Sequence, residues 1–337
     1  MRYGESIVCT TGVRAETGLK RCAVQSAGIL LVQFKLELPR RPFAVSRGRL
    51  RPGWECQMNI ANMRQTRKRP LFLGGPFFPA HDKNRMHDEG DVVGARKRFL
   101  DKRFRNLEAL LSQRYTWMND YIRPDDQVVE FGCGAGFSRL YLRADNLVLT
   151  DYVDQAWVDI RADAMNPPFE PNSIDTIICS HMIHHMAQPT LFFRKVRPLL
   201  RDRGRIIIQD LNTALTMRIL LWVMRHEGWS YDIDVFDENS VTNDPNDPWS
   251  ANCAIPQLLF ESSAAFEANV PGFRVLKNEL NECLLFPLSG GVISRTSVPE
   301  MPDWALSFVQ RLDRMLVGAL PSVFAMGRSV VLEKQAS

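Results

Sequence analysis

One short segment constrains this chain more than any other: an apolar strand sequence that runs directly into three glycines spaced by two. Residues 128–136 read Val-Val-Glu-Phe-Gly-Cys-Gly-Ala-Gly. Glycines permit positive φ and let a ligand lie against bare backbone, and the free N–H groups of a following helix favour a carboxylate or phosphate. A dinucleotide fingerprint would need Gly-x-Gly-x-x-Gly. Here the third glycine comes one residue early and Glu130 stands two residues before the first, so the turn predicts a nucleotide-like ligand of another kind.

Short apolar strands and helices alternate after this turn. The sequence predicts strands at 127–131, 147–151, 157–161, 174–180 and 204–210, with helices near 136–143 and 189–200. Such alternation indicates an α/β fold in which helices cover both faces of a parallel sheet. Farther along the chain we expect a polar loop at 237–249, helices at 255–269 and 303–317, and strands at 273–288 and 324–334.

A helical pattern precedes the glycine turn. Apolar residues recur at steps of three, four and five from Phe99 to Met118, which predicts one amphipathic helix over 92–121 that packs on the core as a lid or flank. We divide the chain into four parts: a disordered leader (1–62), an N-terminal helical flank (63–124), a ligand-binding core (125–212), and further helices with the last strands of the same sheet (213–337).

A series of motifs makes residues 125–212 resemble the core of class I S-adenosylmethionine (SAM)-dependent methyltransferases, in particular the type 11 group. The glycine turn resembles motif I, residues 147–151 the acid-ended second strand, and residues 162–164 the acid after the third strand. Residues 168–175, 180–185 and 199–208 resemble the segments around the fourth strand and the turn into the fifth. The resemblance implies a Rossmann-like, doubly wound, mostly parallel seven-stranded sheet. It also implies an antiparallel C-terminal strand, and extra helices that cover the acceptor side.

The resemblance also implies where SAM would bind. The backbone of Gly132 and Gly134 would approach the methionyl part of SAM, Gly136 would complete this part of the cofactor site, and Glu130 would face the ammonium group.

The adenosine end of SAM is implied to contact acids at two strand ends. Asp151 would accept hydrogen bonds from both ribose hydroxyls, and Asp163 from the adenine amino group, with Ala164 nearby. Only 12 residues separate the two acids, which is too few for the helix that the family usually has there. We therefore expect Tyr152 or Trp157 to rebuild one wall of the adenine pocket.

Three histidines follow the predicted fourth strand at positions i, i+3 and i+4. By the resemblance, Ser180 and His181 line the wall near the sulfonium of SAM. At the start of a helix, His181, His184 and His185 would share one face. Histidine titrates near neutral pH, so His184 or His185 could act as a general base; packing at the SAM wall is the alternative. No metal is expected, because His-x-x-His-His lacks the glutamate of a zincin motif and no other ligand cluster stands beside it.

These residues favour an enzyme that moves a methyl group from SAM to a small-molecule acceptor, at a hydroxyl oxygen. Two alternatives stay open: a nucleic-acid methyltransferase with a basic N-terminal arm, and a non-catalytic SAM-fold binding subunit. Residues 166–169 read Asn-Pro-Pro-Phe, which matches a tetrapeptide of base-amine methyltransferases. They stand before the fourth strand, however, and not after it, so the sequence argues against nucleic acid as the acceptor.

Charge is distributed unevenly along the chain. Residues 1–105 contain 22 Lys and Arg against 9 Asp and Glu, and the remainder contains 20 against 29. A basic end on an acidic body predicts a solvated tail, or an arm that touches nucleic acid or anionic lipid. Residues 215–225 predict an apolar helix that also carries arginines. Such a helix could lie on a membrane surface or cover an apolar substrate.

The sequence also bears on the compartment. No stretch approaches the roughly 20 apolar residues of a membrane span. The seven cysteines form no Cys-x-x-Cys pair, and no secretory signal is recognisable. Free thiols are typical of a reducing compartment, so we expect a cytoplasmic protein.

Overall fold

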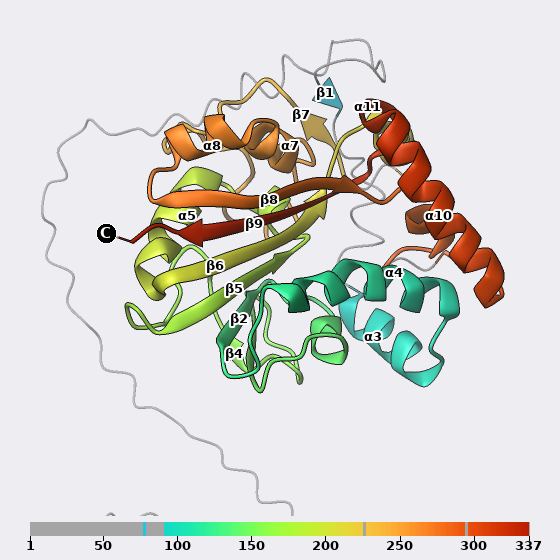
Figure 1. Cartoon of the computed structure of the whole chain (residues 1–337), viewed down its shortest axis with the longest axis horizontal. Helices are drawn as coiled ribbons and strands as arrows, with labels where there is room; N and C mark the ends of the chain where they lie inside the picture. The colour runs from blue at the N-terminus through green and yellow to red at the C-terminus, as the bar shows by residue number, and fades with distance from the viewer. Residues whose placement is uncertain (1–76, 79–90, 225–226, 294–295, 337) are drawn as a thin grey trace, which may run out of the picture. The chain divides into compact units, whose positions relative to one another are not determined.

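A seven-stranded sheet forms the centre of the computed structural model, which describes residues 77–78, 91–224, 227–293 and 296–336. The predicted leader at 1–62 lies outside these residues. The strand order is β4-β3-β2-β5-β6-β9-β8 (Figure 1). The strands are β2 (Gln127–Phe131), β3 (Asn146–Asp151), β4 (Ile160–Arg161), β5 (Ile174–Ser180), β6 (Leu200–Leu211), β8 (Phe273–Asn281) and β9 (Gly327–Lys334). The strands from β4 to β6 in this order are parallel, whereas β9 is antiparallel to both β6 and β8. The predicted doubly wound sheet with an antiparallel C-terminal strand is therefore confirmed.

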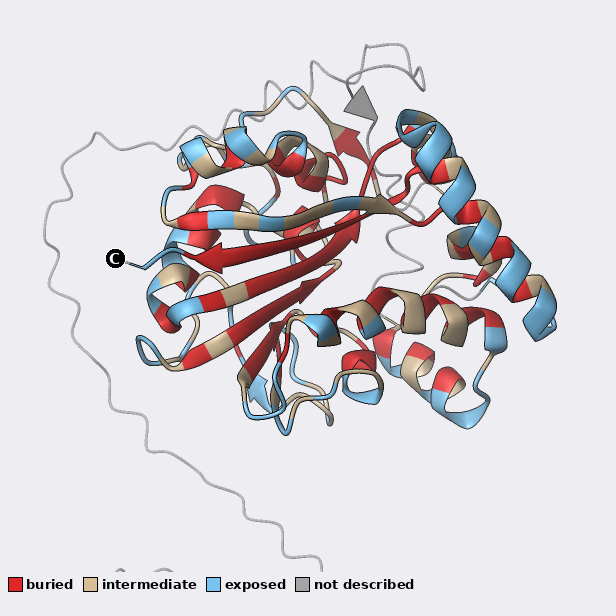
Figure 2. Cartoon of the chain, in the orientation of Figure 1, coloured by how far each residue is buried: buried red, intermediate tan, exposed pale blue. Residues whose placement is uncertain are grey.

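Side chains alternate between the two faces of the sheet, so that each face has its own apolar core. In β6, Ile206 and Ile208 belong to one core and Ile207 to the other, as the pleat of a strand requires. The first core lies against α5 (Pro189–Val196), α7 (Ile255–Phe260) and α8 (Ser263–Asn269). The second lies against α3 (Val92–Asp101), α4 (Arg105–Tyr115) and α10 (Asp303–Ala319). Figure 2 shows the central strands buried between these helices.

The single helix predicted over 92–121 is wrong, because the segment forms α3, α4 and a 3-10 helix, η1 (Thr116–Asp120). The backbone is extended at Lys102 and Phe104, between the two α-helices. The break lets Phe99 of α3 pack edge-on against Phe137, with 4.8 Å between the two ring centroids. Leu110 of α4 is fully buried in the same cluster. Burial of both apolar faces in one core explains why two helices replace a straight one.

Other predicted elements are shorter than expected. The helix at 136–143 is one 3-10 turn, η2 (Phe137–Leu140), and the strand at 157–161 keeps only the two residues of β4. Both residues of β4 are exposed at the sheet edge, so longer pairing there would gain little burial. The strand at 273–288 ends with β8 because Glu282 has a φ of 55°. Asp313 then accepts hydrogen bonds from the backbone N–H groups of residues 283–285, and α9 (Leu285–Leu288) follows.

The remaining elements connect these layers. The helix predicted at 189–200 is α5 followed by a 3-10 turn, η4 (Arg197–Leu199), and the helix predicted at 255–269 is divided into α7 and α8. Beyond the core lie α6 (Leu215–Met224), α11 (Pro321–Phe324) and β7 (Trp229–Ser230), which pairs with β1 (Phe77–Phe78). In the described part of the chain, no helix combines the length and the apolar character needed to cross a membrane.

A buried ion pair joins α4 to the turn after β8. Arg114 donates two hydrogen bonds to the carboxylate of Glu282, at 2.8 and 2.7 Å, and the two side chains are only 4% and 1% exposed. Gln209 of β6 donates a further hydrogen bond to Glu282 at 3.0 Å. The pair therefore attaches the helical flank to the sheet.

We expect Arg114→Met to lower the free energy of unfolding by about 3–5 kcal/mol, because it leaves the Glu282 carboxylate buried without its cation. Urea denaturation at pH 7 measures this change. Arg105→Met is the matched control, because Arg105 pairs with Asp303 at 3.8 Å on the surface and exposed pairs contribute about 1 kcal/mol or less. Equal losses in the two variants would contradict the anchoring role.

Glu130 carries an ionisable side chain from β2 into the interior, where it is fully buried. Ser138 of η2 donates a hydrogen bond to one carboxyl oxygen, and the other oxygen has no hydrogen-bond partner. Burial, reinforced by the charge of Asp151 and opposed by the Ser138 hydrogen bond, raises the pKa of Glu130 to about 8. The folded protein thus holds this carboxyl group neutral at pH 7.

A raised folded pKa makes stability fall as the pH rises, because the folded state alone keeps the proton between the unfolded pKa of about 4.3 and the folded value. Glu130→Gln removes this titration. We expect the unfolding free energy of the variant, relative to the native chain, to rise by at least about 1 kcal/mol between pH 5 and pH 8. Denaturant titrations across this range test the prediction, and a constant difference would refute the neutral carboxyl.

Candidate active site

A cavity of about 970 Å³ lies at the carboxyl edge of the parallel strands. Parallel strands bring their C-terminal ends to one edge, and ligands of open α/β sheets bind outside that edge. The lining includes the residue after β2 (Gly132), the last residue of β3 (Asp151) and the last residue of β5 (Ser180). The strand order thus brings these predicted site residues to one place.

The three glycines of the turn all have left-handed backbone, with φ of 66°, 51° and 63°, but they differ in surroundings. A Cβ on Gly132 would lie 2.7 Å from Cγ of Met182, and one on Gly136 would lie 2.6 Å from Cδ1 of Trp157. A Cβ on Gly134 would meet nothing within 4 Å. Gly132 and Gly136 are therefore required by packing, whereas Gly134 presents bare backbone to the cavity.

Asp151 links the glycine loop to β3. One carboxylate oxygen accepts a hydrogen bond from the N–H of Gly134 at 2.8 Å, and the other accepts one from the N–H of Val153 at 3.0 Å. A carboxylate has about four lone-pair sites, so acceptor capacity remains on the side chain that lines the cavity. The loop and the carboxylate thus hold each other in position.

Two aromatic residues after β3 take different places. Tyr152 lines the cavity and is half exposed. Trp157 lies behind the loop, where its indole N–H donates to the carbonyl oxygen of Gly134 at 2.8 Å and the guanidinium of Arg96 lies 4.8 Å from its ring centroid. Of the two candidates for the rebuilt wall, Tyr152 faces the cavity and Trp157 supports the loop.

The remaining predicted cofactor residues fall into two groups. Asp163, Ala164, Ser180 and His181 line the cavity, whereas Glu130 and Gly136 do not belong to its lining. His181 has a φ of 52°, and its Nε2 is buried without a hydrogen-bond partner. Burial, followed by the positive charge of Arg114, lowers the pKa of His181 well below its usual value, so this ring is neutral.

His184 lies in a short 3-10 turn after β5, η3 (Ile183–His185), and is anchored by a buried carboxylate. Its Nδ1 is 2.5 Å from Oδ1 of Asp210, near the end of β6. Asp210 also accepts hydrogen bonds from the N–H of Ile183 at 2.9 Å and from its neighbour Leu211 at 2.7 Å. The imidazole is therefore fixed with its Nε2 atom as the free ring nitrogen.

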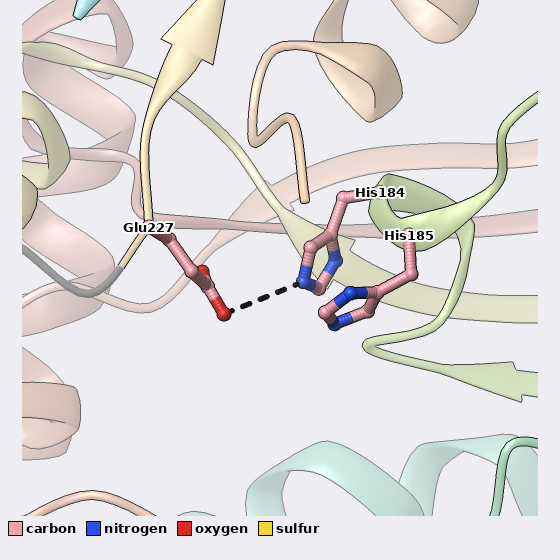
Figure 3. A group of neighbouring side chains, drawn as sticks. All are labelled: His184, His185 and Glu227. Atoms are coloured by element: carbon pink, nitrogen blue, oxygen red, sulfur yellow. Dashed lines mark ion pairs between the residues drawn. The ribbon is translucent and has the colours of Figure 1, made fainter. Parts of the chain in front are cut away.

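Glu227 completes a cluster with the two histidines of η3. Its Oε1 is 3.9 Å from Nε2 of His184, and its Oε2 accepts a hydrogen bond from the thiol of Cys253 at 3.2 Å. The Nδ1 of His185 is 3.1 Å from the carbonyl oxygen of Ser250. Figure 3 shows His184 and His185 side by side with Glu227 opposite them. All three residues line the cavity.

The two imidazoles differ in their electrostatics. Burial lowers the pKa of His184, but the charge and hydrogen bond of Asp210 and the charge of Glu227 outweigh burial, so the net shift is upward. Burial and the neighbouring His184 lower the pKa of His185 to about 4. One ring of the pair thus favours a positive charge and the other stays neutral.

The sequence prediction brought the three histidines to the cavity but missed Asp210. Asp210 stands near the end of a buried strand, and that same signal identified Asp151. Glu227 follows α6, more than 40 residues after the histidines. No local pattern connects it to them, and only the fold brings the carboxylate to the ring.

The wall beyond the histidines is mostly apolar. It is contributed by α6 and by the segment around α9. Lining side chains include Met217, Leu220, Leu221, Phe286 and Pro287. The cavity therefore has a polar end at the glycine loop and an apolar end beyond the His–Glu cluster.

Residues 98–242 match the sequence profile of a family described as methyltransferase domain. No curated protein matches the sequence. Among solved structures, a SAM-dependent methyltransferase from Archaeoglobus fulgidus is 16% identical, with 71% of this chain and 99% of that chain covered and a TM-score of 0.44. A protein assigned as a methyltransferase, solved with the Trm112 methyltransferase activator of Haloferax volcanii, is 13% identical, with 74% and 99% covered and a TM-score of 0.41.

A third structure, the [4+2]-cyclase SpnF, is 15% identical, with 68% and 79% covered and a TM-score of 0.37. Similarities this low carry no argument about chemistry. The family match covers the glycine turn, the acid-ended β3 and the histidine turn after β5. Residues 98–242 of this chain therefore match a methyltransferase domain.

Proposed function

We propose that the chain transfers the methyl group of SAM to a hydroxyl oxygen of an apolar small molecule. One observation carries this proposal: a single cavity joins the glycine loop and Asp151 at one end to the His184–His185–Glu227 cluster and an apolar wall at the other. Donor and acceptor could lie there together, and holding two reactants close and aligned supplies much of the catalysis of a transfer reaction.

The polar end of the cavity fits SAM. The open backbone at Gly134 leaves room for the methionyl part, and the spare acceptor capacity of Asp151 suits the ribose hydroxyls. Asp163 and Ala164 would contact the adenine. When bound, SAM supplies a methyl group activated by its sulfonium.

Other residues would shape this end less directly. Ser180 and His181 would line the wall near the sulfur. Glu130 lies behind the loop and reaches it through Ser138, so we assign it to positioning of the loop.

The opposite end supports a hydroxyl acceptor. His184 and His185 stand beside the apolar wall, and one of these side chains would deal with the proton that a hydroxyl loses on methylation. The cavity volume lies at the upper end of the range for small-molecule sites, about 300–1,000 Å³. An apolar molecule with a phenol-like hydroxyl fits this lining best.

Alternative acceptors receive less support. In the described part of the chain, the wall beyond the histidines is mostly apolar. The lysine and arginine of the cavity lining are both engaged: Arg114 is paired with Glu282, and Lys195 donates to the carbonyl oxygen of Met165. Nucleic acid would call for free cations there. Apolar side chains of α6 are also exposed, among them Ile219, Trp222 and Val223, which supports contact with a lipid-like acceptor or a lipid surface.

Asp151→Asn should weaken SAM binding by at least about tenfold, since the variant loses charged acceptors for the ribose and a partner for the glycine loop. Calorimetry with SAM measures the affinity. Asp154→Asn removes the same charge from an exposed position three residues away and should leave binding unchanged. The assignment of the cofactor end fails if the folded Asp151 variant binds as tightly as the native chain.

Incubation with SAM labelled in its methyl group tests the acceptor class directly. We expect label to appear in phenols from a panel of phenols, sugars and amines. His184→Gln should lower kcat by about 100-fold or more, the usual contribution of a proton-handling group, with an unchanged Kd for SAM. Label in amines alone would overturn the oxygen assignment, and no turnover despite SAM binding would favour the non-catalytic subunit.

A further inference from the structure

We infer that His184, His185 and Glu227 bind one divalent transition-metal ion, and that this ion receives the acceptor hydroxyl. The inference deepens the proposed function and rests on it for the nature of the acceptor. Metal binding itself depends only on the three side chains.

The three side chains have ligand-like geometry. Each offers one ligand atom, and these atoms all lie within 4.8 Å of one another. Two ligands around a tetrahedral first-row ion are separated by about 3.4 Å when each bond is about 2.1 Å long. Nε2 of His184 and Oε1 of Glu227 are 3.9 Å apart and the whole set spans up to 4.8 Å, so the side chains must approach one another by up to about 1.4 Å to complete the site.

Both imidazoles are oriented as metal ligands usually are. Metal-bound histidines almost always donate their second ring N–H to a carboxylate, a carbonyl or water. Here Nδ1 of His184 meets Asp210 at 2.5 Å, and Nδ1 of His185 meets the carbonyl oxygen of Ser250 at 3.1 Å. These contacts leave the Nε2 lone pair of each ring available on the cavity side.

The electrostatics also call for a cation. Asp210 contacts Nδ1 of His184, and Glu227 faces Nε2 of the same ring at 3.9 Å. Two carboxylates thus lie on opposite sides of an imidazole that is 3% exposed, and they favour a positive charge between them. A bound ion can supply that charge in place of a proton on His184, and His185 adds a third donor from the adjoining residue (Figure 3).

The donor set indicates the type of ion. Two imidazoles and one carboxylate suit Zn²⁺, Mn²⁺ or Fe²⁺, whereas Mg²⁺ and Ca²⁺ prefer oxygen ligands. Three protein ligands leave coordination positions open, as in catalytic rather than structural sites. The sequence predicted no metal because the histidine motif lacks a glutamate and no other ligand cluster stands near it in the sequence. The Glu227 carboxylate, which follows α6, reaches the rings only through the fold.

A bound ion would make the hydroxyl group of the acceptor more acidic. A metal-bound hydroxyl loses its proton to water far more readily than a free one. The oxygen then forms a bond to the methyl carbon while the carbon–sulfur bond of SAM breaks. The products are a methyl ether, S-adenosylhomocysteine and the released proton, with no change of oxidation state. His184 and His185 then act as ligands and not as bases.

The full-length protein, treated with EDTA and dialysed, tests the inference by calorimetry with MnCl₂ and ZnCl₂ and by electron paramagnetic resonance of bound Mn²⁺. We expect one ion per chain. Glu227→Gln and His185→Gln each remove a ligand and should weaken binding of the ion by more than about 100-fold, because loss of a residue that only orients a ligand already costs about 10–100-fold. Asp244→Asn changes a carboxylate of the same wall outside the cluster and should bind the ion normally.

Affinity for SAM, measured on the same samples, separates the two proposals and reports folding. A native chain that binds SAM but neither ion overturns the metal site and leaves His184 as the proton acceptor of the proposed function. The metal site is equally overturned if the folded Glu227 and His185 variants bind Mn²⁺ as tightly as the native chain. Metal binding without SAM binding would instead refute the proposed function alone.

Discussion

The parallel order of β3, β2, β5 and β6 places the ends of four strands at one edge of the sheet. Each end contributes a different group: glycine backbone after β2, Asp151 at the end of β3, Ser180 at the end of β5 and Asp210 near the end of β6. None of these groups is close to the next in sequence. Their proximity follows from the direction of the strands, so any change that shifted the register of β2 or β5 would separate the cofactor end of the cavity from the histidines.

The parts predictable from sequence were those fixed by local chemistry. Three glycines before a turn, an acid at the end of an apolar strand, and histidines after the next strand all carry their signals within a few residues. The break between α3 and α4 could not be read locally, because it depends on how Phe99 and Leu110 share one core. The contact between Glu227 and His184 could not be read locally either, since the two residues are brought together by the fold.

The glycine turn illustrates how one motif serves two physical purposes. Gly132 and Gly136 are needed because Met182 and Trp157 occupy the space of a side chain, whereas Gly134 leaves its space empty for a ligand. A sequence pattern cannot distinguish these cases, because all three positions show the same residue. Trp157 donates to the carbonyl of Gly134 while Asp151 accepts from its N–H, so the exposed peptide is held from both sides.

Two buried carboxyl groups near the cavity, those of Asp210 and Glu130, differ in the number of hydrogen bonds that they accept. Asp210 has hydrogen bonds from two backbone N–H groups and a contact with His184, whereas Glu130 has one from Ser138 and its raised pKa keeps it neutral. The acids that line the cavity are Asp151, Asp163, Glu227, Asp244 and Asp247. In the proposed complex, this negative lining favours the sulfonium of SAM over the uncharged sulfur that remains after transfer. The electrostatics that hold the donor would thus also release the product.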